Sequence, residues 1–269
     1  MTREPRTGFV PVAGTTLAWE MAGEGPPVVF LHGFSLDRRM WDDQVDAFAP
    51  RYTVVRYDLR GFGRSPAADV PYRHADDLAA LLDHLQIDSP ALVGLSMGGG
   101  AVIGFATSNP GRARALVLVD TFLAGFAWSK DFTDSLGAVS KTAKKEGLDA
   151  ARREWLASPL LANALARKEL APRLRAMIEG YSGWHWLNRD RGQPIVPPAI
   201  LRLSEIQVPT LAVVGERDAA DFQRVAETIE RDVPGARRLV MPGVGHLPNM
   251  EDPARFNDVV LDFLEASGG

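Results

Sequence analysis

The run Gly94-Leu95-Ser96-Met97-Gly98 decides how this chain folds. It matches the pattern G-x-S-x-G, in which a serine stands on a sharp turn between a strand and a helix. The turn strains the serine backbone, so the residues two positions away on each side must be small. The context fits, because an apolar run at 91–95 leads into the turn and a small, apolar run at 101–108 leaves it. A plain glycine-rich turn is the alternative, since the pattern alone is common.

Outward from Ser96, short β-rich runs alternate with helical runs. Periodicity predicts eight strands, at 9–12, 16–20, 27–31, 53–57, 91–95, 115–119, 210–214 and 236–241. Apolar residues at helical spacing and terminal signals predict helices at 75–85, 101–108 and 253–264. This alternation predicts an α/β fold with a mostly parallel, eight-stranded sheet that helices cover on both faces.

One long segment breaks the alternation. Between Val119 and Thr210 the sequence is helix-prone and contains no strand-like run. We predict that residues 121–198 form a helical cap inserted between two late strands, while residues 1–120 and 199–269 form the core domain. The proline-rich stretch at 192–198 is the expected exit linker.

A serine nucleophile needs a base, and the chain contains five histidines. His74 and His84 fall in or beside a predicted helix and are expected at the surface. His185 stands between two tryptophans and is expected to line a pocket or a helix crossing. His246 follows the last predicted strand in a glycine-rich loop, which can carry an imidazole over the carboxyl edge of the sheet. We therefore predict that His246 is the base.

The base in turn needs an acid that fixes its tautomer and stabilises the imidazolium. Asp218 follows the predicted strand at 210–214, so the chain order would be Ser, Asp, His. Asp120 ends an earlier strand and is the rival acid. We predict that Asp218 completes the triad and that Glu216 is a structural ion-pair or capping group.

Acyl transfer also needs two donors aimed at the oxyanion of the tetrahedral intermediate. The backbone N–H of Met97, at a predicted helix N-terminus, would be one donor. The N–H of Phe34, in the run Leu31-His32-Gly33-Phe34-Ser35, would be the other. His32 is expected to brace this loop through hydrogen bonds rather than to take part in catalysis.

Aromatic residues of the predicted cap are candidates for the pocket wall. Their large apolar area and few rotatable bonds suit the binding of an acyl or alcohol group. We expect substrate-binding residues among Phe126, Trp128, Trp184 and Trp186, and at least one of them should face Ser96. The alternative is that these side chains only pack the cap together. Trp184 and Trp186 would share a face in an extended segment and point apart on a helix.

Taken together, these motifs resemble the α/β-hydrolase superfamily. The resemblance rests on Gly33-Phe34, the run from Tyr57 to Ser65, Gly94 to Gly99, Gly215 to Asp218 and Gly245-His246, and it covers nearly the whole chain except the cap. The pieces are similar to carboxylesterases, non-haem haloperoxidases and perhydrolases, 3-oxoadipate enol-lactonases and some acyl-homoserine lactonases. In that group the turn from Asp58 to Ser65 is structural.

The resemblance also narrows the reaction. A serine nucleophile sets aside haloalkane dehalogenases and soluble epoxide hydrolases, which use aspartate. Perhydrolase-like members often carry tryptophan at the position of Phe34, which disfavours that activity here. The predicted function is hydrolysis of a small to medium carboxylic ester through an acyl-enzyme, with a lactonase as the main alternative. A carbon–carbon bond hydrolase is a further alternative on the same triad, and a non-enzymatic ligand receptor is the competing class.

Composition bounds the remaining properties. The chain has 269 residues with 46% hydrophobic and 24% charged residues, which suits one large domain or a domain with an insertion. It has no cysteine, which excludes disulfides and thiolate metal sites. The net charge is −4, and no basic block or signal-like N-terminus is seen, so no nucleic-acid or membrane partner is expected. We expect a cytoplasmic enzyme without metal or cofactor that acts on a small-molecule ester or lactone. The oligomeric state is not encoded in these patterns.

Overall fold

Eight strands of the computed structural model form one sheet, in the order β1-β2-β4-β3-β5-β6-β7-β8. The structure describes residues 4–268, so residues 1–3 and 269 at the ends of the predicted core lie outside it. The strands are β1 (Arg6–Val12), β2 (Thr15–Ala22), β3 (Pro27–Leu31), β4 (Thr53–Tyr57), β5 (Ala91–Leu95), β6 (Ala115–Val119), β7 (Thr210–Gly215) and β8 (Arg237–Met241). Only the β1–β2 and β2–β4 pairs are antiparallel. The predicted eight-stranded, mostly parallel sheet is confirmed.

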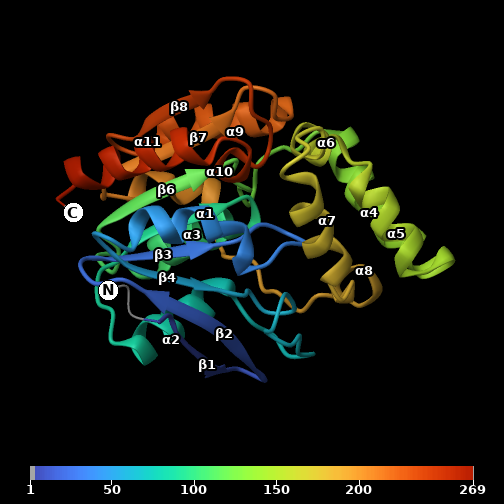
Figure 1. Ribbon diagram of the computed structural model, residues 1–269, viewed down its shortest axis with the longest axis horizontal. Helices are drawn as coiled ribbons and strands as arrows, with labels where there is room; N and C mark the ends of the chain where they lie inside the picture. The colour runs from blue at the N-terminus through green and yellow to red at the C-terminus, as the bar shows by residue number, and fades with distance from the viewer. Residues whose placement is uncertain (1–3, 269) are drawn as a thin grey trace.

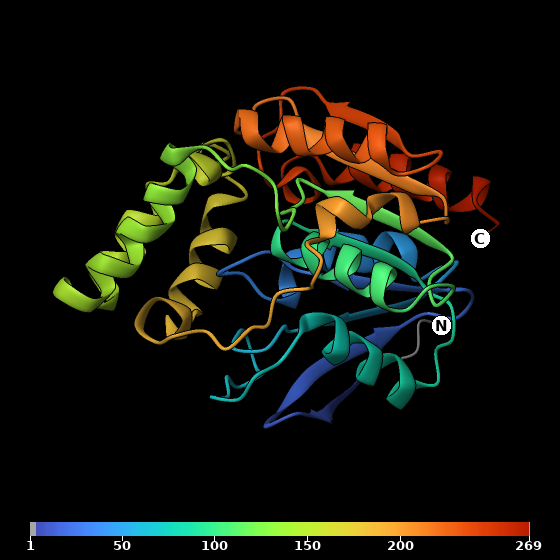
Figure 2. The same ribbon diagram turned by 180° about the vertical axis from the view of Figure 1, so that it is seen from behind.

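Helices cover both faces of this sheet (Figures 1 and 2). One face carries α1 (Asp42–Phe48) and α11 (Pro253–Ala266), with the short α10 (Pro248–Glu251) beside them. The other carries α2 (His74–Leu85), α3 (Met97–Ser108) and α9 (Ala220–Asp232), joined through the 3-10 helix η2 (Ala199–Glu205). All residues of the central strands β5, β6 and β7 are buried, as a sheet covered on both faces requires.

The segment between β6 and β7 contributes helices that lie off one end of the sheet. They are α4 (Lys130–Glu146), α5 (Leu148–Leu156), α6 (Pro159–Leu165), α7 (Ala171–Gly180) and α8 (Trp184–Leu187). Figure 1 shows them beyond the carboxyl ends of the parallel strands. The first of them begins at Ser129, whose Oγ accepts the N–H of Phe132 as an N-cap. We call α4 to α8 the inserted helices; their division from the core as a separate cap stays a prediction. Within residues 4–268 no helix is both long and apolar enough to cross a membrane.

Candidate active site

Ser96 stands on a strained turn between β5 and α3. Its φ is 52° and its ψ −113°, a conformation that L-residues rarely adopt. Glycines make the turn possible: a Cβ on Gly94 would lie 2.5 Å from the Gly98 oxygen, and one on Gly98 would lie 2.4 Å from the Leu31 oxygen. The Ser96 N–H donates to the Val119 oxygen at 2.9 Å, which ties the turn to β6. The serine is therefore held by backbone at the carboxyl edge of the sheet.

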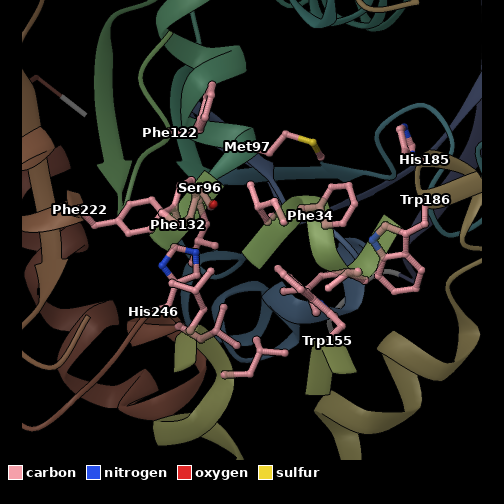
Figure 3. A pocket seen from close by; sticks show the side chains of 18 of the residues that line it. Phe34, Ser96, Met97, Phe122, Phe132, Trp155, His185, Trp186, Phe222 and His246 are labelled. Carbon is pink, nitrogen blue, oxygen red and sulfur yellow. The ribbon is translucent and has the colours of Figure 1, made fainter. Parts of the chain in front are cut away.

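His246 and Asp218 meet above the same edge. The Nδ1 of His246 donates to the Asp218 Oδ2 at 2.8 Å, and the Ala219 N–H donates to the other carboxylate oxygen at 2.7 Å. The Asp218 side chain has no solvent exposure and that of His246 only 6%. A proton on Nδ1 leaves Nε2 as the acceptor that a general base needs. Figure 3 shows Ser96 and the His246 ring on the same side of one cavity, which both residues line.

Close packing of two glycines brings the acid and base loops together. A Cβ on Gly215, at the end of β7, would lie 2.0 Å from the oxygen of Gly245. Glu216 accepts the N–H of Gly243 at 2.8 Å, so it braces the histidine loop through a hydrogen bond to backbone. Of the two roles expected for Glu216, an ion pair or a cap on backbone N–H groups, the hydrogen bond from Gly243 corresponds to the second.

Asp120 is a buried third carboxyl beside this pair. Its Oδ1 accepts the Gly215 N–H at 3.0 Å, while its Oδ2 finds no donor within residues 4–268. Burial, reinforced by the negative charge of Asp218, raises the pKa of Asp120 well above its ordinary value, which favours its neutral form. Only Asp218 is bonded to His246. The geometry therefore favours Asp218 over Asp120 as the partner of the base.

The same three side chains are the one group within residues 4–268 whose spacing could hold a metal ion. Ligand atoms of Asp120, Asp218 and His246 lie within 4.8 Å of one another. The Nδ1 of His246, however, carries a proton toward Asp218 and has no lone pair for a metal. The hydrogen bond between Asp218 and His246 instead orients the imidazole.

Glu251 holds the histidine loop through hydrogen bonds to its backbone, a role that was not predicted from the sequence. Its buried carboxylate accepts the Gly245 N–H at 2.9 Å and the Leu247 N–H at 3.2 Å, which are the residues on either side of His246. Asn163 of α6 also donates to it, and the Arg167 guanidinium lies 3.5 Å away. An acidic residue five positions after the histidine was the signal available in the sequence.

The predicted oxyanion donors lie on either side of the turn. Met97 is the first residue of α3, where N–H groups have no intrahelical acceptor and the helix dipole favours negative charge. Phe34 follows β3, and its N–H donates to no protein acceptor within the described chain. Both residues line the cavity with Ser96. The arrangement can place two donors around a developing oxyanion.

His32 fixes the loop that carries Phe34. The Leu59 N–H donates to its Nε2 at 2.8 Å, so the ring proton is on Nδ1 and donates to the Gly33 oxygen at 2.8 Å. Burial lowers the pKa of His32 and keeps the ring neutral. The structure thus gives His32 the bracing role that we expected.

The cavity beside Ser96 has a volume of about 370 Å³ and a largely aromatic and aliphatic wall. Figure 3 shows this wall, which the inserted helices and the core share. Its aromatic members are Phe34, Phe122, Phe132, Trp155, Trp186 and Phe222. Of these, only Trp186 was predicted from the sequence to bind substrate. Phe34 was predicted only as an oxyanion donor through its backbone N–H. The others were missed because the inserted segment carries no motif that shows which face of a helix meets the core.

Three of the four expected wall residues lie elsewhere, and this corrects the assignment. Trp128 stacks on Phe122 and Phe132, with ring centroids 5.0 Å and 4.7 Å away, so it supports two wall residues from behind. Phe126 packs edge-on against Trp128. Trp184 is on the short helix α8 with Trp186 and points away from it; Trp186 is 3% exposed and lines the cavity.

Two further histidines have defined places. His185 was expected to line a pocket or a helix crossing, and it lines the cavity. Its ring stacks on that of Phe62, with ring centroids 4.5 Å apart. Burial lowers the pKa of His185 to about 4, so it is neutral at pH 7. His74, expected at the surface, is half-buried, with its Nδ1 enclosed and its ring packed edge-on against Tyr72. His84 is exposed, as expected.

Comparison with known proteins places this geometry among hydrolases. The model of the alpha/beta hydrolase family matches residues 28–259. A pimeloyl-[acyl-carrier protein] methyl ester esterase of Yersinia enterocolitica is 27% identical over 93% of this chain and 98% of its own length.

Two solved structures are similar over nearly their whole length. A thermophilic esterase from Thermogutta terrifontis, in a malate-bound form, has a TM-score of 0.84 and 29% identity, over 97% of this chain and 99% of that chain. The enol-lactonase from Burkholderia xenovorans has a TM-score of 0.81 and 26% identity, over 96% and 100% of the two chains.

Proposed function

The chain belongs to the alpha/beta hydrolase family, and from this premise we propose that it hydrolyses small to medium carboxylic esters through an acyl-enzyme on Ser96. One observation carries the proposal. The 2.8 Å hydrogen bond from His246 to the buried carboxylate of Asp218 leaves Nε2 as an acceptor beside a cavity that Ser96 also lines. The similar esterases support the same reaction class.

In the proposed reaction each residue of the site has a separate role. The Ser96 hydroxyl attacks the ester carbonyl and its proton passes to His246 Nε2, while Asp218 stabilises the imidazolium. The N–H groups of Phe34 and Met97 bind the oxyanion. Collapse of the intermediate expels the alcohol, which takes the proton from His246 and leaves the acyl group on Ser96. Water, deprotonated by His246, then attacks the acyl-enzyme, and collapse of the second intermediate releases the acid while His246 returns the proton to the Ser96 oxygen.

The cavity supports the size of the substrate. A volume of about 370 Å³ is at the small end of the range for sites that hold drug-sized ligands. Its apolar wall suits the hydrocarbon part of an acyl or alcohol group, and its polar groups gather near Ser96 and His246 and near His185. We therefore place medium-length and shorter esters above long-chain lipids.

A lactone is the second candidate, favoured by the similar enol-lactonase. Ring opening needs the same nucleophile, base and oxyanion donors, because a lactone is a cyclic ester. It differs in that the leaving alcohol stays attached to the acyl group, so the cavity must hold both parts at once.

The test is a panel of p-nitrophenyl esters of increasing acyl length and of lactones with five- and six-membered rings, followed by pH-stat titration. We expect hydrolysis of esters by the native protein and a loss of several orders of magnitude in kcat for Ser96→Ala, because triad members act as a unit. Turnover of lactones with no ester activity would replace the first candidate by the second. A Ser96→Ala variant that keeps more than about a tenth of the activity would remove Ser96 from the mechanism.

A further inference from the structure

The wall of the cavity carries an uneven set of charges. Among the residues of 4–268 that line it, none is lysine or arginine. Its ionisable side chains are His185, Asp190 and His246. The rest of the wall is apolar apart from the hydroxyls of Ser96 and Ser140. A substrate group that enters therefore meets hydrocarbon, neutral dipoles and at most one permanent charge.

His185 does not supply a positive charge. Burial lowers its pKa to about 4, so the ring is neutral at pH 7. The backbone N–H of His185 donates to the Tyr181 hydroxyl at 3.0 Å, and that hydroxyl lies 2.8 Å from the ring Nδ1. The hydroxyl thus donates to Nδ1, which fixes the neutral ring.

Asp190 supplies a negative charge without a paired cation. Its Oδ1 accepts the Tyr72 hydroxyl at 2.9 Å and the Gly192 N–H at 3.1 Å, and both donors are neutral. The neighbouring Arg191 pairs with Asp69 instead, at 3.5 Å. No ion pair to Asp190 is present among the described residues. Asp190 is itself exposed, so water screens its charge, but this part of the wall offers an anion no cation from the described residues that line the cavity.

We propose that this cavity selects neutral esters and rejects esters whose acyl chain ends in a carboxylate. The inference rests on the proposed esterase function and adds the charge class of its substrate. A carboxylate that enters must leave its hydration shell, and the wall offers no cation to replace the water. Asp190 adds a small repulsion between like charges, because it is exposed and water screens it. A terminal methyl or methyl ester has no such cost.

Three substrates of one chain length separate charge from size. Methyl hexanoate ends in a methyl group, monomethyl adipate in a carboxylate, and dimethyl adipate in a neutral ester larger than either. Values of kcat/KM come from methanol release at pH 7.5. We expect monomethyl adipate to be poorer than dimethyl adipate by on the order of 100-fold, since an unpaired charge is costly to desolvate. Methyl hexanoate should be turned over as well as or better than dimethyl adipate.

Two variants test the wall directly. Leu136→Arg places a cation on the lining segment of α4, and Asp190→Asn removes the negative charge. Both should raise the ratio of kcat/KM on monomethyl adipate to that on dimethyl adipate, Leu136→Arg by about tenfold or more. Asp134→Asn is the matched control, because it makes the same change in net charge at a side chain that is exposed, as Asp190 is, but does not line the cavity. It should leave the ratio unchanged.

Each outcome decides something. Equal kcat/KM on the two adipates overturns the charge selection and leaves the esterase function standing. The same shift for Asp134→Asn as for Asp190→Asn overturns it too, because the effect would then come from the field of the whole protein. Slow reaction with both adipates but not with methyl hexanoate assigns the limit to size and not to charge. Hydrolysis of none of the three esters removes the proposed function and this inference with it.

Discussion

At the scale of single residues, two aspartates share one buried site and differ in their hydrogen bonds. Asp218 accepts from His246 and from a backbone N–H, so both of its oxygens have donors. Asp120 has one backbone donor and one oxygen without a donor in the described chain, and its pKa is raised by burial and by Asp218, which favours its neutral form. The aspartate bonded to the base is therefore the one whose carboxylate is fully hydrogen-bonded.

This difference predicts how the two amide variants behave. Asp218→Asn should lower kcat by on the order of 10⁴, because the amide favours the wrong tautomer of His246. Asp120→Asn should cost far less, because Asp218 and not Asp120 is bonded to His246, and an amide resembles the neutral carboxyl that the raised pKa of Asp120 favours. Both variants are measured on the same ester, with circular dichroism to confirm folding. The reverse order of the two losses would make Asp120 the acid.

At the scale of elements, the base sits on a loop that other elements hold in place. Glu251 at the end of α10 accepts the N–H groups on both sides of His246, and Asn163 and Arg167 link it to the inserted helices. The position of the imidazole thus depends on contacts from α6 as well as from the core.

We predict that Glu251→Gln lowers kcat by about 10 to 100-fold with a smaller change in KM. The amide N–H₂ would face a backbone N–H, so the loop must shift, and a displacement of about 1 Å can cost that much. The matched control is Glu216→Gln, since Glu216 braces the same loop through Gly243 from an exposed position. Similar losses in both variants would show general loosening of the loop and not a specific hold on His246.

The short helix α8 offers a second comparison. Trp186 lines the cavity and its neighbour Trp184 does not, although both belong to the same turn of helix. Trp186→Ala should therefore change the order of kcat/KM across a series of acyl lengths more than it changes the value for acetate. Trp184→Ala should leave the order unchanged. If the two profiles coincide, the aromatic wall does not set chain-length preference.

Helix α3 shows a case in which the sequence pattern does not predict where an element begins. The apolar run at 101–108 predicts the body of α3, whereas Gly98, Gly99 and Gly100 ahead of it are poor helix formers. The helix begins at Met97 since those glycines allow close contact with β3 and with Thr121. Tertiary packing thus overrides local propensity next to the predicted nucleophile, where a close approach of backbones is needed.

At the scale of the whole molecule, the sheet and the predicted triad could be read from the sequence and the cavity wall could not. The signals for the sheet and the triad are local: they are the strand ends, the glycines and the order Ser96, Asp218, His246. Each is visible within a short stretch of sequence, because a sharp turn needs small residues at its own positions. The wall is assembled from distant segments, so Phe132 and Phe222 meet only after the inserted helices pack on the core. Nothing within a single amphipathic helix specifies which partner its apolar face meets.

Histidines with lowered pKa values make the stability of the whole fold depend on pH. The pKa of His185 is lowered from 6.5 to about 4 in the folded protein, while the unfolded chain takes up its proton near the ordinary value. Between these values the unfolded state binds more protons, so stability is complete above about pH 6.5 and falls as the pH drops toward 4. His32 and His74 have lowered pKa values for the same reason, whereas Asp120, with a raised pKa, acts in the opposite sense.

One variant isolates the contribution of His185 to the pH dependence of the unfolding free energy. His185→Gln removes the titrating ring and keeps a polar side chain of similar length, while the other three groups remain and cancel in a comparison. The free energy of unfolding from urea titrations at pH 7.5 and pH 5 should fall more in the native protein than in the variant, by roughly 1–2 kcal/mol. The variant can be less stable at both pH values because it loses the stacking on Phe62, so the difference between the two pH values is what counts. Parallel losses in the two proteins would mean that His185 takes up its proton without resistance from the fold, and that the cavity wall gains a positive charge near neutral pH.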